Sequence, residues 1–295
     1  MKYRADSLGL SGNVTVILRD LIHEQLGLMY EPHHFDHVAD RLAPLVVERS
    51  LSSFMDYYYL LKYSATSDDW LKVMDALAVQ ETYFWREIDQ LRAVVNVIVP
   101  EIVRTLRGTP LRIWSIPCAT GEEPLTIAML LAEAGWFDRA PIEICASDAS
   151  PSAIARARQG HYTQRSFRNL PPAMRDKYFA AHEGYWSPDP ALYQRVSYDI
   201  VNLMAEDQMM RHASTPIVFC RNVFIYFSER SIRRALAVFE REMPSPGYLC
   251  VAASESLLRR TTTFELQEIG GAFVYVKDVP AGRSEPVAPR VEQVS

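Results

Sequence analysis

The sequence predicts an α/β protein in which a small all-α N-terminal domain precedes a doubly wound, mostly parallel sheet. Helical periodicity with almost no strand signal fills residues 1–80, which define the first domain. From about residue 83, short apolar runs alternate with amphipathic helices, a pattern typical of a parallel sheet covered on both faces. The 295 residues are 48% hydrophobic, so the chain can bury a full core in one large domain or two ordinary ones.

Apolar residues that recur three and four positions apart predict four helices in the first domain. Two stripes cover 14–26 and 35–46, and two shorter helices follow behind Ser52 and Ser67. Pro44 lies inside the second stripe. Because proline cannot donate an intrahelical hydrogen bond, we expect it to kink or split that helix.

The second domain, residues 81–279, is predicted from alternating strand and helix signals. The expected strands lie at 111–116, 142–146, 217–220 and 248–252. The expected helices lie at 84–98, at 122–134, behind Ser150-Pro151 and at 228–243. Gly270-Gly271 predicts a closing hairpin, and a small insert occupies the region near 160–200. Residues 280–295, rich in proline and charge, are predicted to be disordered.

Charge and hydropathy exclude several classes of function. The formal net charge is -5, and because proteins that wrap nucleic acid normally carry a basic footprint, nucleic acid is not the expected partner. The longest apolar runs, 217–219 and 223–227, are far shorter than the ~20 residues that span a bilayer. Residues 1–12 contain no apolar signal core, so we expect a cytoplasmic protein without a membrane span.

Cysteine and histidine spacing does not predict a metal site. The chain contains four widely spaced cysteines in apolar stretches, namely Cys118, Cys145, Cys220 and Cys250. No histidine lies at zinc-site spacing from them, so we interpret them as reduced core residues. His33, His34 and His37 cluster near the N-terminus, where surface or capping positions explain them better than a metal does.

The segment after the first expected strand carries two adjacent carboxylates. Residues 117–124 read Pro-Cys-Ala-Thr-Gly-Glu-Glu-Pro, which matches neither a dinucleotide-binding glycine loop nor a Walker loop. Glu122 and Glu123 would repel a pyrophosphate at the helix N-terminus, whereas a cationic, phosphate-free ligand tolerates them. Alternatively, Thr120 and Glu123 form a capping box and have no ligand role.

Polar residues follow the next two strand ends, and ligands of doubly wound sheets lie beyond such ends. Asp148 stands where an acidic residue usually binds ribose hydroxyls, although it can instead cap the next helix. Asn202-Leu203 ends a strand-like run over 196–201. The Asn amide can read an adenine edge and the Leu side chain can pack on the ring.

An arginine and an asparagine interrupt the apolar run over 217–227. Arg221 and Asn222 are costly there unless they have partners, because buried polar groups must be hydrogen-bonded. Their place at the carboxyl end of a strand predicts that they line the cleft. A core arginine-carboxylate pair is the alternative.

Five motifs together resemble those of the CheR-type methyltransferases. In chain order they are Glu-Thr-Tyr-Phe-Trp-Arg at 81–86, Thr-Gly-Glu-Glu-Pro at 120–124, Ala-Ser-Asp at 146–148, Asn-Leu at 202–203 and Cys-Arg-Asn-Val-Phe-Ile-Tyr-Phe at 220–227. The resemblance covers almost the whole chain, including the helical N-terminal domain. This family uses S-adenosylmethionine (SAM) to methylate glutamate side chains on chemoreceptors, and S-adenosylhomocysteine is the product.

The resemblance implies a protein-glutamate O-methyltransferase built on a SAM-dependent methyltransferase sheet, and it implies roles for individual residues. The implied cofactor-binding residues are Gln80, Thr82, Arg86, Glu123, Asp148, Asn202, Leu203, Arg221 and Asn222. The implied catalytic residues are Arg86, Arg221 and Tyr226. Thr82 and Arg86 would contact the methionine end of the cofactor, and Tyr226 would lie near the transferring methyl group.

The second N-terminal helix departs from the family pattern. The chemotaxis enzymes carry several arginines there that meet the acidic receptor, whereas this chain keeps Arg41 and Arg49 but has apolar Pro44, Leu45 and Val47. Loss of positive charge should weaken long-range attraction to an acidic partner. The expected methyl acceptor is therefore a chemoreceptor or a related signalling protein. The alternative function is a SAM-binding regulatory or docking module without methyl transfer.

Overall fold

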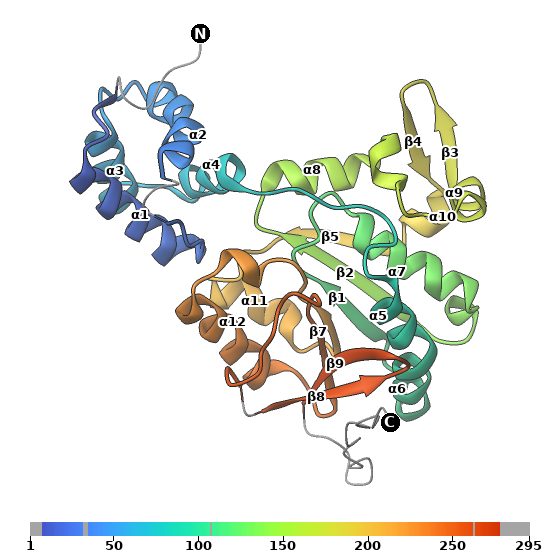
Figure 1. Cartoon of the computed structure of the whole chain (residues 1–295). Helices are drawn as coiled ribbons and strands as arrows, with labels where there is room; N and C mark the ends of the chain where they lie inside the picture. Colours follow the sequence, from blue (N-terminus) through green and yellow to red (C-terminus); the bar gives the residue numbers. More distant parts are fainter. Residues whose placement is uncertain (1–7, 32–34, 107, 262, 278–295) are drawn as a thin grey trace, which may run out of the picture.

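A computed structural model describes residues 8–31, 35–106, 108–261 and 263–277, and it confirms the predicted fold class. Figure 1 shows a blue helical domain beside an α/β domain with a central sheet. The helical domain contains α1 (Gly12–Leu26), α2 (Phe35–Glu48), α3 (Phe54–Tyr63) and α4 (Ser67–Leu77). The tail at 280–295, predicted to be disordered, lies outside the described residues.

The four N-terminal helices pack their apolar stripes into a core of their own. α2 is a single continuous helix, so the predicted split at Pro44 does not occur. Pro44 is exposed, and its neighbours Ala43 and Val46 are fully buried in this core, so tertiary packing outweighs the lost hydrogen bond. Leu45 and Val47 are half-buried against the same core, so the apolar residues of α2 pack on the protein itself.

The central sheet has seven strands in the order β5-β2-β1-β6-β7-β9-β8. The bounds are β1 (Leu111–Ser115), β2 (Ile142–Asp148), β5 (Val196–Ile200), β6 (Ile217–Phe219), β7 (Gly247–Cys250), β8 (Phe264–Ile269) and β9 (Ala272–Lys277). The strands from β5 to β7 pair in parallel, and β9 is antiparallel to both β7 and β8. The order reverses between β1 and β6, where the carboxyl ends of the strands leave a crevice for a ligand.

The two faces of the sheet bury two separate cores, and strand side chains alternate between them. In β6, Ile217 and Phe219 enter one core and Val218 enters the other. The first face is covered by α5 (Ile88–Ala93), α6 (Val99–Thr105), α7 (Glu122–Glu133) and α8 (Pro151–Gln159). The second face is covered by α11 (Glu206–Ala213) and α12 (Glu229–Glu242). Burial on both faces explains the continuous apolar runs in these strands.

A π-helical turn over Val94–Ile98 carries the helix before β1 past a proline. α5 continues through this turn into α6, although Pro100 lies in the first turn of α6. In a π-helix each carbonyl accepts a hydrogen bond from the amide five residues further along the chain. For the carbonyl of Val95 that residue is Pro100, which has no amide hydrogen to donate. Trp136 Nε1 donates to that carbonyl oxygen at 3.1 Å instead, so the proline leaves no buried acceptor unsatisfied.

The insert between α8 and β5 lies far from the helical domain (Figure 1). It contains α9 (Pro172–Tyr178), β3 (Phe179–His182), β4 (Tyr185–Pro188) and α10 (Pro190–Tyr193). β3 and β4 form an antiparallel hairpin. These short elements and α11 were not predicted individually, because none is long enough to show a periodic apolar stripe.

The described residues also test the expectations on metals, cysteines and membranes. All four cysteines are buried and free, as predicted. Within the described ranges, no three His, Cys, Asp or Glu side chains gather as a metal site. His33 and His34 lie outside those ranges. No helix in the part of the chain that the structure describes is long and apolar enough to cross a membrane.

Candidate functional site

A cavity of about 230 Å³ lies beyond the carboxyl ends of β1, β2 and β6, where the helical domain faces the sheet. Every sequence-predicted site residue except Gln80 lines it: Thr82, Arg86, Glu123, Asp148, Asn202, Leu203, Arg221, Asn222 and Tyr226. The opposite wall comes from the helical domain and includes Leu26, Leu28, Met74 and Leu77. The topology therefore gathers residues from all five sequence motifs around one space.

Gln80 lies outside this lining, at the connection between the two domains. Its Nε2 donates to Ser150 Oγ at 2.9 Å and to Ser152 Oγ at 3.0 Å, in the first turn of α8. Asp75 of α4 accepts from the backbone amide of Ser152 at 3.1 Å, next to these contacts. Gln80 therefore helps to fix α4 on α8, and its contact with a cofactor stays a prediction.

The loop between β1 and α7 is held tightly, and it requires a glycine. Gly121 has φ 95°, and a Cβ there would lie 3.0 Å from Tyr162 Oη and 3.1 Å from Tyr198 Oη. Tyr162 Oη donates to the carbonyl of Thr120 at 3.0 Å. The absence of a side chain at Gly121 therefore lets the loop pack closely against Tyr162 and Tyr198.

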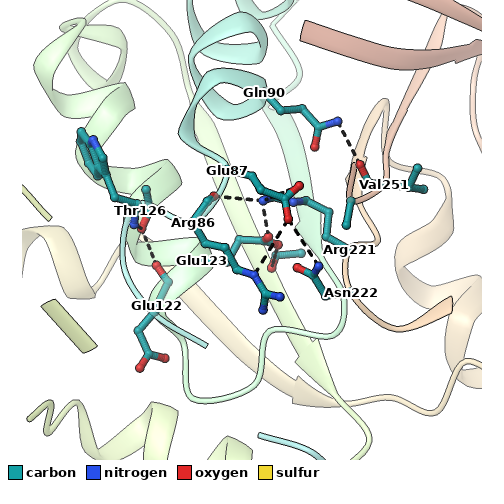
Figure 2. A network of polar contacts seen from close by, with 12 residues as sticks. Arg86, Glu87, Gln90, Glu122, Glu123, Thr126, Arg221, Asn222 and Val251 are labelled. Atoms are coloured by element: carbon teal, nitrogen blue, oxygen red, sulfur yellow. Dashed lines mark hydrogen bonds and ion pairs between the residues drawn. The ribbon is translucent and has the colours of Figure 1, made fainter. Parts of the chain in front are cut away.

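Glu122 is buried, Glu123 is half-buried with 16% of its side chain exposed, and the two side chains point in different directions (Figure 2). Glu122 accepts from Thr120 Oγ1 at 2.6 Å and from Ser166 Oγ at 2.9 Å, away from the cavity. Glu123 accepts from Ser115 Oγ at 2.7 Å and lines the cavity. The alternative capping box is therefore wrong, since Gly121 is the N-cap of α7 and makes no side-chain cap bond.

Burial raises the pKa of Glu123, and the charge of Arg221 offsets part of that rise. Arg221 Nη1 lies 3.4 Å from Glu123 Oε2. Because one cation faces the carboxylate on one side, Glu123 can stay ionised in a place that excludes water. When ionised, Glu123 presents a negative charge to the cavity.

Asp148 ends β2 and joins the loop after β1 to the start of α8. Its Oδ2 accepts from the amide of Ala119 and its Oδ1 from the amide of Ser150, both at 2.9 Å. Ser150, not Asp148, caps α8. Burial raises the pKa of Asp148 above its usual value, and these backbone hydrogen bonds offset part of that rise. Each carboxylate oxygen keeps a second lone pair, so Asp148 can still accept from a hydroxyl of a ligand.

Asn202 and Leu203 lie beyond β5 and close the cavity near α1. Asn202 Oδ1 accepts from the amide of Met204 at 2.9 Å, and its Nδ2 donates to the carbonyl of Gln25 at 3.0 Å. One Nδ2 hydrogen therefore remains for a ligand, because a side-chain amide carries two. Leu203 is buried with one side on the cavity.

Arg221 is the central cation of the site, with only 1% of its side chain exposed. Its Nη2 donates to the carbonyl of Arg86 at 3.0 Å and lies 3.5 Å from Glu87 Oε2. Both sequence interpretations therefore hold, since Arg221 pairs with the half-buried carboxylates of Glu87 and Glu123 and also lines the cavity. Its Nε and Nη1 make no hydrogen bond in the structure, although Nη1 faces Glu123, so Nε is a buried donor without a partner.

A tight turn before α5 presents Arg86 at the mouth of the cavity. Trp85 and Glu87, the residues on either side of Arg86, have φ values of 70° and 47°, a conformation that non-glycine residues rarely adopt. Arg86 Nη1 donates to the carbonyl of Glu81 at 3.1 Å. Such backbone strain is concentrated at functional sites, where surrounding contacts maintain it.

Sequence reasoning missed two supporting carboxylates. Glu87 lies in this turn (Figure 2), and Glu255 supports the loop after β6. Glu87 accepts from the amide of Ala253 at 3.1 Å and from Asn222 Nδ2 at 3.4 Å. Glu255 accepts from three amides of the loop after β6, the shortest at 2.7 Å from Phe224. The sequence did contain a signal for Glu87. Two arginines in the cleft require carboxylate partners, and Glu87 directly follows Arg86.

The chain after α1 joins the helical domain to Tyr226. The amide of Met29 donates to the carbonyl of Tyr226 at 2.8 Å, and Leu28 and Phe227 form an isolated antiparallel bridge. His23 Nε2 lies 2.7 Å from the Oγ of Ser228, the N-cap of α12. These contacts fasten the apolar wall over the carboxyl edge of the sheet.

The comparisons with known proteins agree with this site. A family model described as the SAM-binding domain of CheR methyltransferases matches residues 80–272. This chain belongs to the CheR methyltransferase family. It is 33% identical to chemotaxis protein methyltransferase 2 of Vibrio cholerae over 88% of this chain and 91% of that protein. It is 28% identical to the chemotaxis protein methyltransferase of Escherichia coli, with 88% of each chain covered. The probable biofilm formation methyltransferase WspC of Pseudomonas putida is 30% identical over 90% of this chain and 62% of its own length.

The residues of the cavity fit SAM, the cofactor of the CheR family. SAM carries a sulfonium cation and no phosphate, which suits the carboxylates of Glu123 and Asp148 on the cavity wall. Its ribose carries hydroxyl groups that Asp148 can bind. Its methionine end carries a carboxylate, which suits the guanidinium of Arg86 at the mouth of the cavity. The chain is therefore a SAM-dependent methyltransferase of the CheR family.

Proposed function

We propose that this methyltransferase transfers the methyl group of SAM to glutamate side chains of a chemoreceptor or a related signalling protein. The observation that carries the proposal is one cavity lined by Glu123, Asp148 and Arg221, with Arg86 and Tyr226 at the mouth. The similar proteins of V. cholerae and E. coli are named chemotaxis protein methyltransferases, which supports the same acceptor here.

The proposed contacts divide the cavity by the parts of SAM. Asp148 accepts from the ribose hydroxyls, while Asn202 and Leu203 hold the adenine by an amide hydrogen bond and by packing. Thr82 and Arg86 contact the methionine end, and Glu123 lies near the adenosyl group. Arg221 and Asn222 line the cleft between them, and Tyr226 lies near the methyl group.

The reaction needs positioning more than acid-base chemistry. SAM supplies an electrophilic methyl group on a sulfonium. As the C–O bond to the glutamate forms, the C–S bond breaks, and the negative and positive charges cancel along the path. No general base is required, because the attacking carboxylate is already ionised. Positioning and exclusion of water can contribute ~7–11 kcal/mol when the geometry is well held.

Arg86 is suited to orient the incoming carboxylate without binding it tightly. Its side chain is 28% exposed, and its Nε lies 4.0 Å from Glu87 Oε1, so its charge is already partly compensated. A strong ion pair would stabilise the ionised nucleophile more than the transition state, in which that charge is disappearing. The partial pairing of Arg86 therefore favours turnover.

A labelled-methyl assay tests the proposed function. The protein is incubated with methyl-tritiated SAM and chemoreceptor-containing membranes, and the washed product is treated with base. Glutamyl methyl esters release volatile tritiated methanol. Labelled membranes that release no methanol would indicate another acceptor atom, and SAM binding without any transfer would indicate a regulatory module instead.

The roles at the mouth are tested by Arg86→Ala and Tyr226→Phe. Both changes should lower turnover more than SAM affinity, because these side chains act at the reacting end of the cofactor. Calorimetry measures affinity while methanol release measures turnover. Normal turnover in both variants would remove Arg86 and Tyr226 from the active site.

A further inference from the structure

Positive side chains gather beside the mouth of the cavity, on the start of α12 and the turn after β7. Four of them form what is called here the arginine surface: Arg230, Arg233, Arg259 and Arg260. Arg233 lines two adjoining hollows, one with Arg230 and the other with Arg259 and Arg260. The four guanidinium groups therefore belong to one continuous surface.

The arginine surface keeps a net positive charge. Glu229 Oε1 lies 3.2 Å from Arg233 Nε, and Glu229 Oε2 lies 2.8 Å from Arg260 Nε, so one carboxylate serves two arginines. Arg230 and Arg259 form no ion pair with any residue in the described ranges. Glu255, which borders the hollow, is engaged by backbone amides and does not pair with these arginines.

α2, the helix that the family resemblance assigns to the receptor contact, offers no comparable positive surface. Arg41 of α2 donates to the carbonyls of Leu77 at 3.3 Å and Ala78 at 3.1 Å, so it caps the C-terminus of α4. Arg49, just after α2, is paired with Asp69. Both arginines that remain in this part of the family pattern therefore hold the helical domain together.

The hollow of the arginine surface adjoins the catalytic cavity. The short helix Phe224–Tyr226 separates the two: Ile225 lines the hollow and Tyr226 lines the cavity. Ile225 is 52% exposed and Leu258, across the hollow, is 62% exposed. An occupant of the hollow would therefore meet two exposed apolar side chains and several arginines next to the active-site cavity.

We propose that the arginine surface docks an acidic amphipathic helix of the methyl-accepting protein and so guides its glutamates to Tyr226. The inference rests on the proposed function, because it assumes a glutamate-bearing acceptor. Charge complementarity selects this occupant: apolar side chains of the helix cover Ile225 and Leu258, and its carboxylates face the arginines. Charges at the rim of an interface act mainly on association rate and salt dependence.

The experiment uses the full chain and a synthetic helical peptide of Leu-Glu-Glu-Leu-Ala-Glu-Ala repeats, with a second peptide that has Gln at every Glu position. The test variant is Arg230→Glu/Arg259→Glu, because neither arginine supports the fold through an ion pair. The control is Arg104→Glu/Arg211→Glu, which makes the same change in net charge. Arg104 and Arg211 are exposed near the ends of α6 and α11, which lead into the amino ends of strands.

Peptide binding is measured by fluorescence anisotropy at low and high salt, and SAM binding by calorimetry. The wild type should bind the Glu peptide about tenfold more tightly than the Gln peptide. The test variant should lose that preference, and the control should keep it. SAM affinity is compared at pH 8, where His23 is neutral with or without the nearby charge of Arg230, and there it should be unchanged. Equal loss in both variants, no loss in either, or no binding of the Glu peptide by the wild type overturns the inference.

Two further readouts separate this inference from the proposed function and from a lipid partner. If the peptide docks through the arginine surface but no methyl group is transferred to it or to receptor membranes, the proposed function fails while the docking surface stands. If both variants methylate membranes as the wild type does, the docking surface fails and the function stands. Tighter binding to phosphatidylserine vesicles than to the Glu peptide, lost in the test variant, would assign the arginines to a membrane surface instead.

Discussion

The two walls of the cavity are built in opposite ways. The sheet wall is charged, and its three central groups are fixed by hydrogen bonds or ion pairs: Asp148 and Arg221 are buried and Glu123 is half-buried. The wall from the helical domain is mainly apolar, with Leu26 and Leu77 almost fully buried. The sheet wall therefore determines which ligand binds, while the helical wall excludes water from it.

The walls also differ in what holds them. Strand pairing over the whole sheet supports the charged wall, whereas a few polar contacts near His23, Gln25 and Met29 join α1 to the α/β domain. Buried charges that lose a partner cost several kcal/mol, while a single neutral hydrogen bond contributes about 1 kcal/mol. We therefore expect changes on the charged wall to have larger effects than changes at the joint.

The largest effect is expected from Arg221→Met. Removing the buried cation leaves Glu123 and Glu87 facing each other, and removal of one partner from a buried ion pair typically costs about 3–5 kcal/mol. The free energy of unfolding, measured with urea at neutral pH, should fall by that amount. SAM affinity should fall as well.

Arg221→Lys is the control for this variant, since it keeps the charge and loses the planar fork. It should recover much of the stability and less of the SAM affinity. A methionine variant as stable as the wild type would mean that the charged wall does not depend on its central cation.

A smaller effect is expected from Asp148→Ala. This carboxylate ties the loop after β1 to the start of α8 and is the proposed ribose acceptor. Loss of hydrogen bonds to a charged group costs about 1.5–3 kcal/mol, so SAM affinity should fall by tenfold or more in calorimetry. Asp189→Ala, a change in an exposed helix cap far from the cavity, should leave the affinity as it is. Equal affinities for all three proteins would contradict the cofactor assignment.

A still smaller, pH-dependent effect is expected from Glu123. Burial raises its pKa, so its carboxyl takes up a proton at higher pH than an exposed glutamate does. The protonated form loses its attraction for a sulfonium, so SAM affinity should fall as pH drops through that raised value. In Glu123→Gln the affinity should be weaker at neutral pH and less dependent on pH. A wild-type affinity that is constant down to the pKa of an ordinary glutamate would be inconsistent with this role.

The sequence predicted the charged wall well because topology alone brings its residues together. Asp148 and Arg221 each follow a strand, and the carboxyl ends of parallel strands must meet at one edge of a sheet. The resemblance to the CheR family then added Thr82, Arg86 and Tyr226, which lie on turns whose position no periodicity predicts. All of them line the cavity.

The sequence predicted the helical wall less well because its contacts depend on tertiary packing. Gln80 could not be placed from spacing, and it contacts Ser150 and Ser152 instead of lining the cavity. Pro44 should disrupt a helix by local rules, yet the core around α2 keeps that helix intact. The supporting carboxylate of Glu87 was missed because its partners, Asn222 and Arg221, lie 135 and 134 positions away in the chain.

The smallest predicted effect concerns the joint itself. Ser228 Oγ accepts from the amide of Ser231 at 3.1 Å, so its hydroxyl hydrogen can point to Nε2 of a neutral His23 at 2.7 Å. Burial, and then the charge of Arg230, lower the pKa of His23 below its usual 6.5. The joined state therefore favours neutral His23. Its contribution is complete above about pH 6.5 and is lost as pH falls through the lowered value.

His23→Ala separates this effect from the titration of Glu123, because both proteins keep Glu123. At each pH, the ratio of the SAM dissociation constants of the variant and the wild type cancels the shared dependence on the carboxyl group. Near pH 7.5 the variant should bind SAM about threefold more weakly, since one hydrogen bond to the covering wall is lost. As pH falls through the lowered pKa of His23, the ratio should approach one, because protonated His23 no longer accepts from Ser228 and adds a positive charge at the N-terminus of α12. A ratio that stays constant with pH would show that packing and backbone contacts alone hold the apolar wall. The two walls would then differ more in what holds them than the polar contacts of α1 suggest.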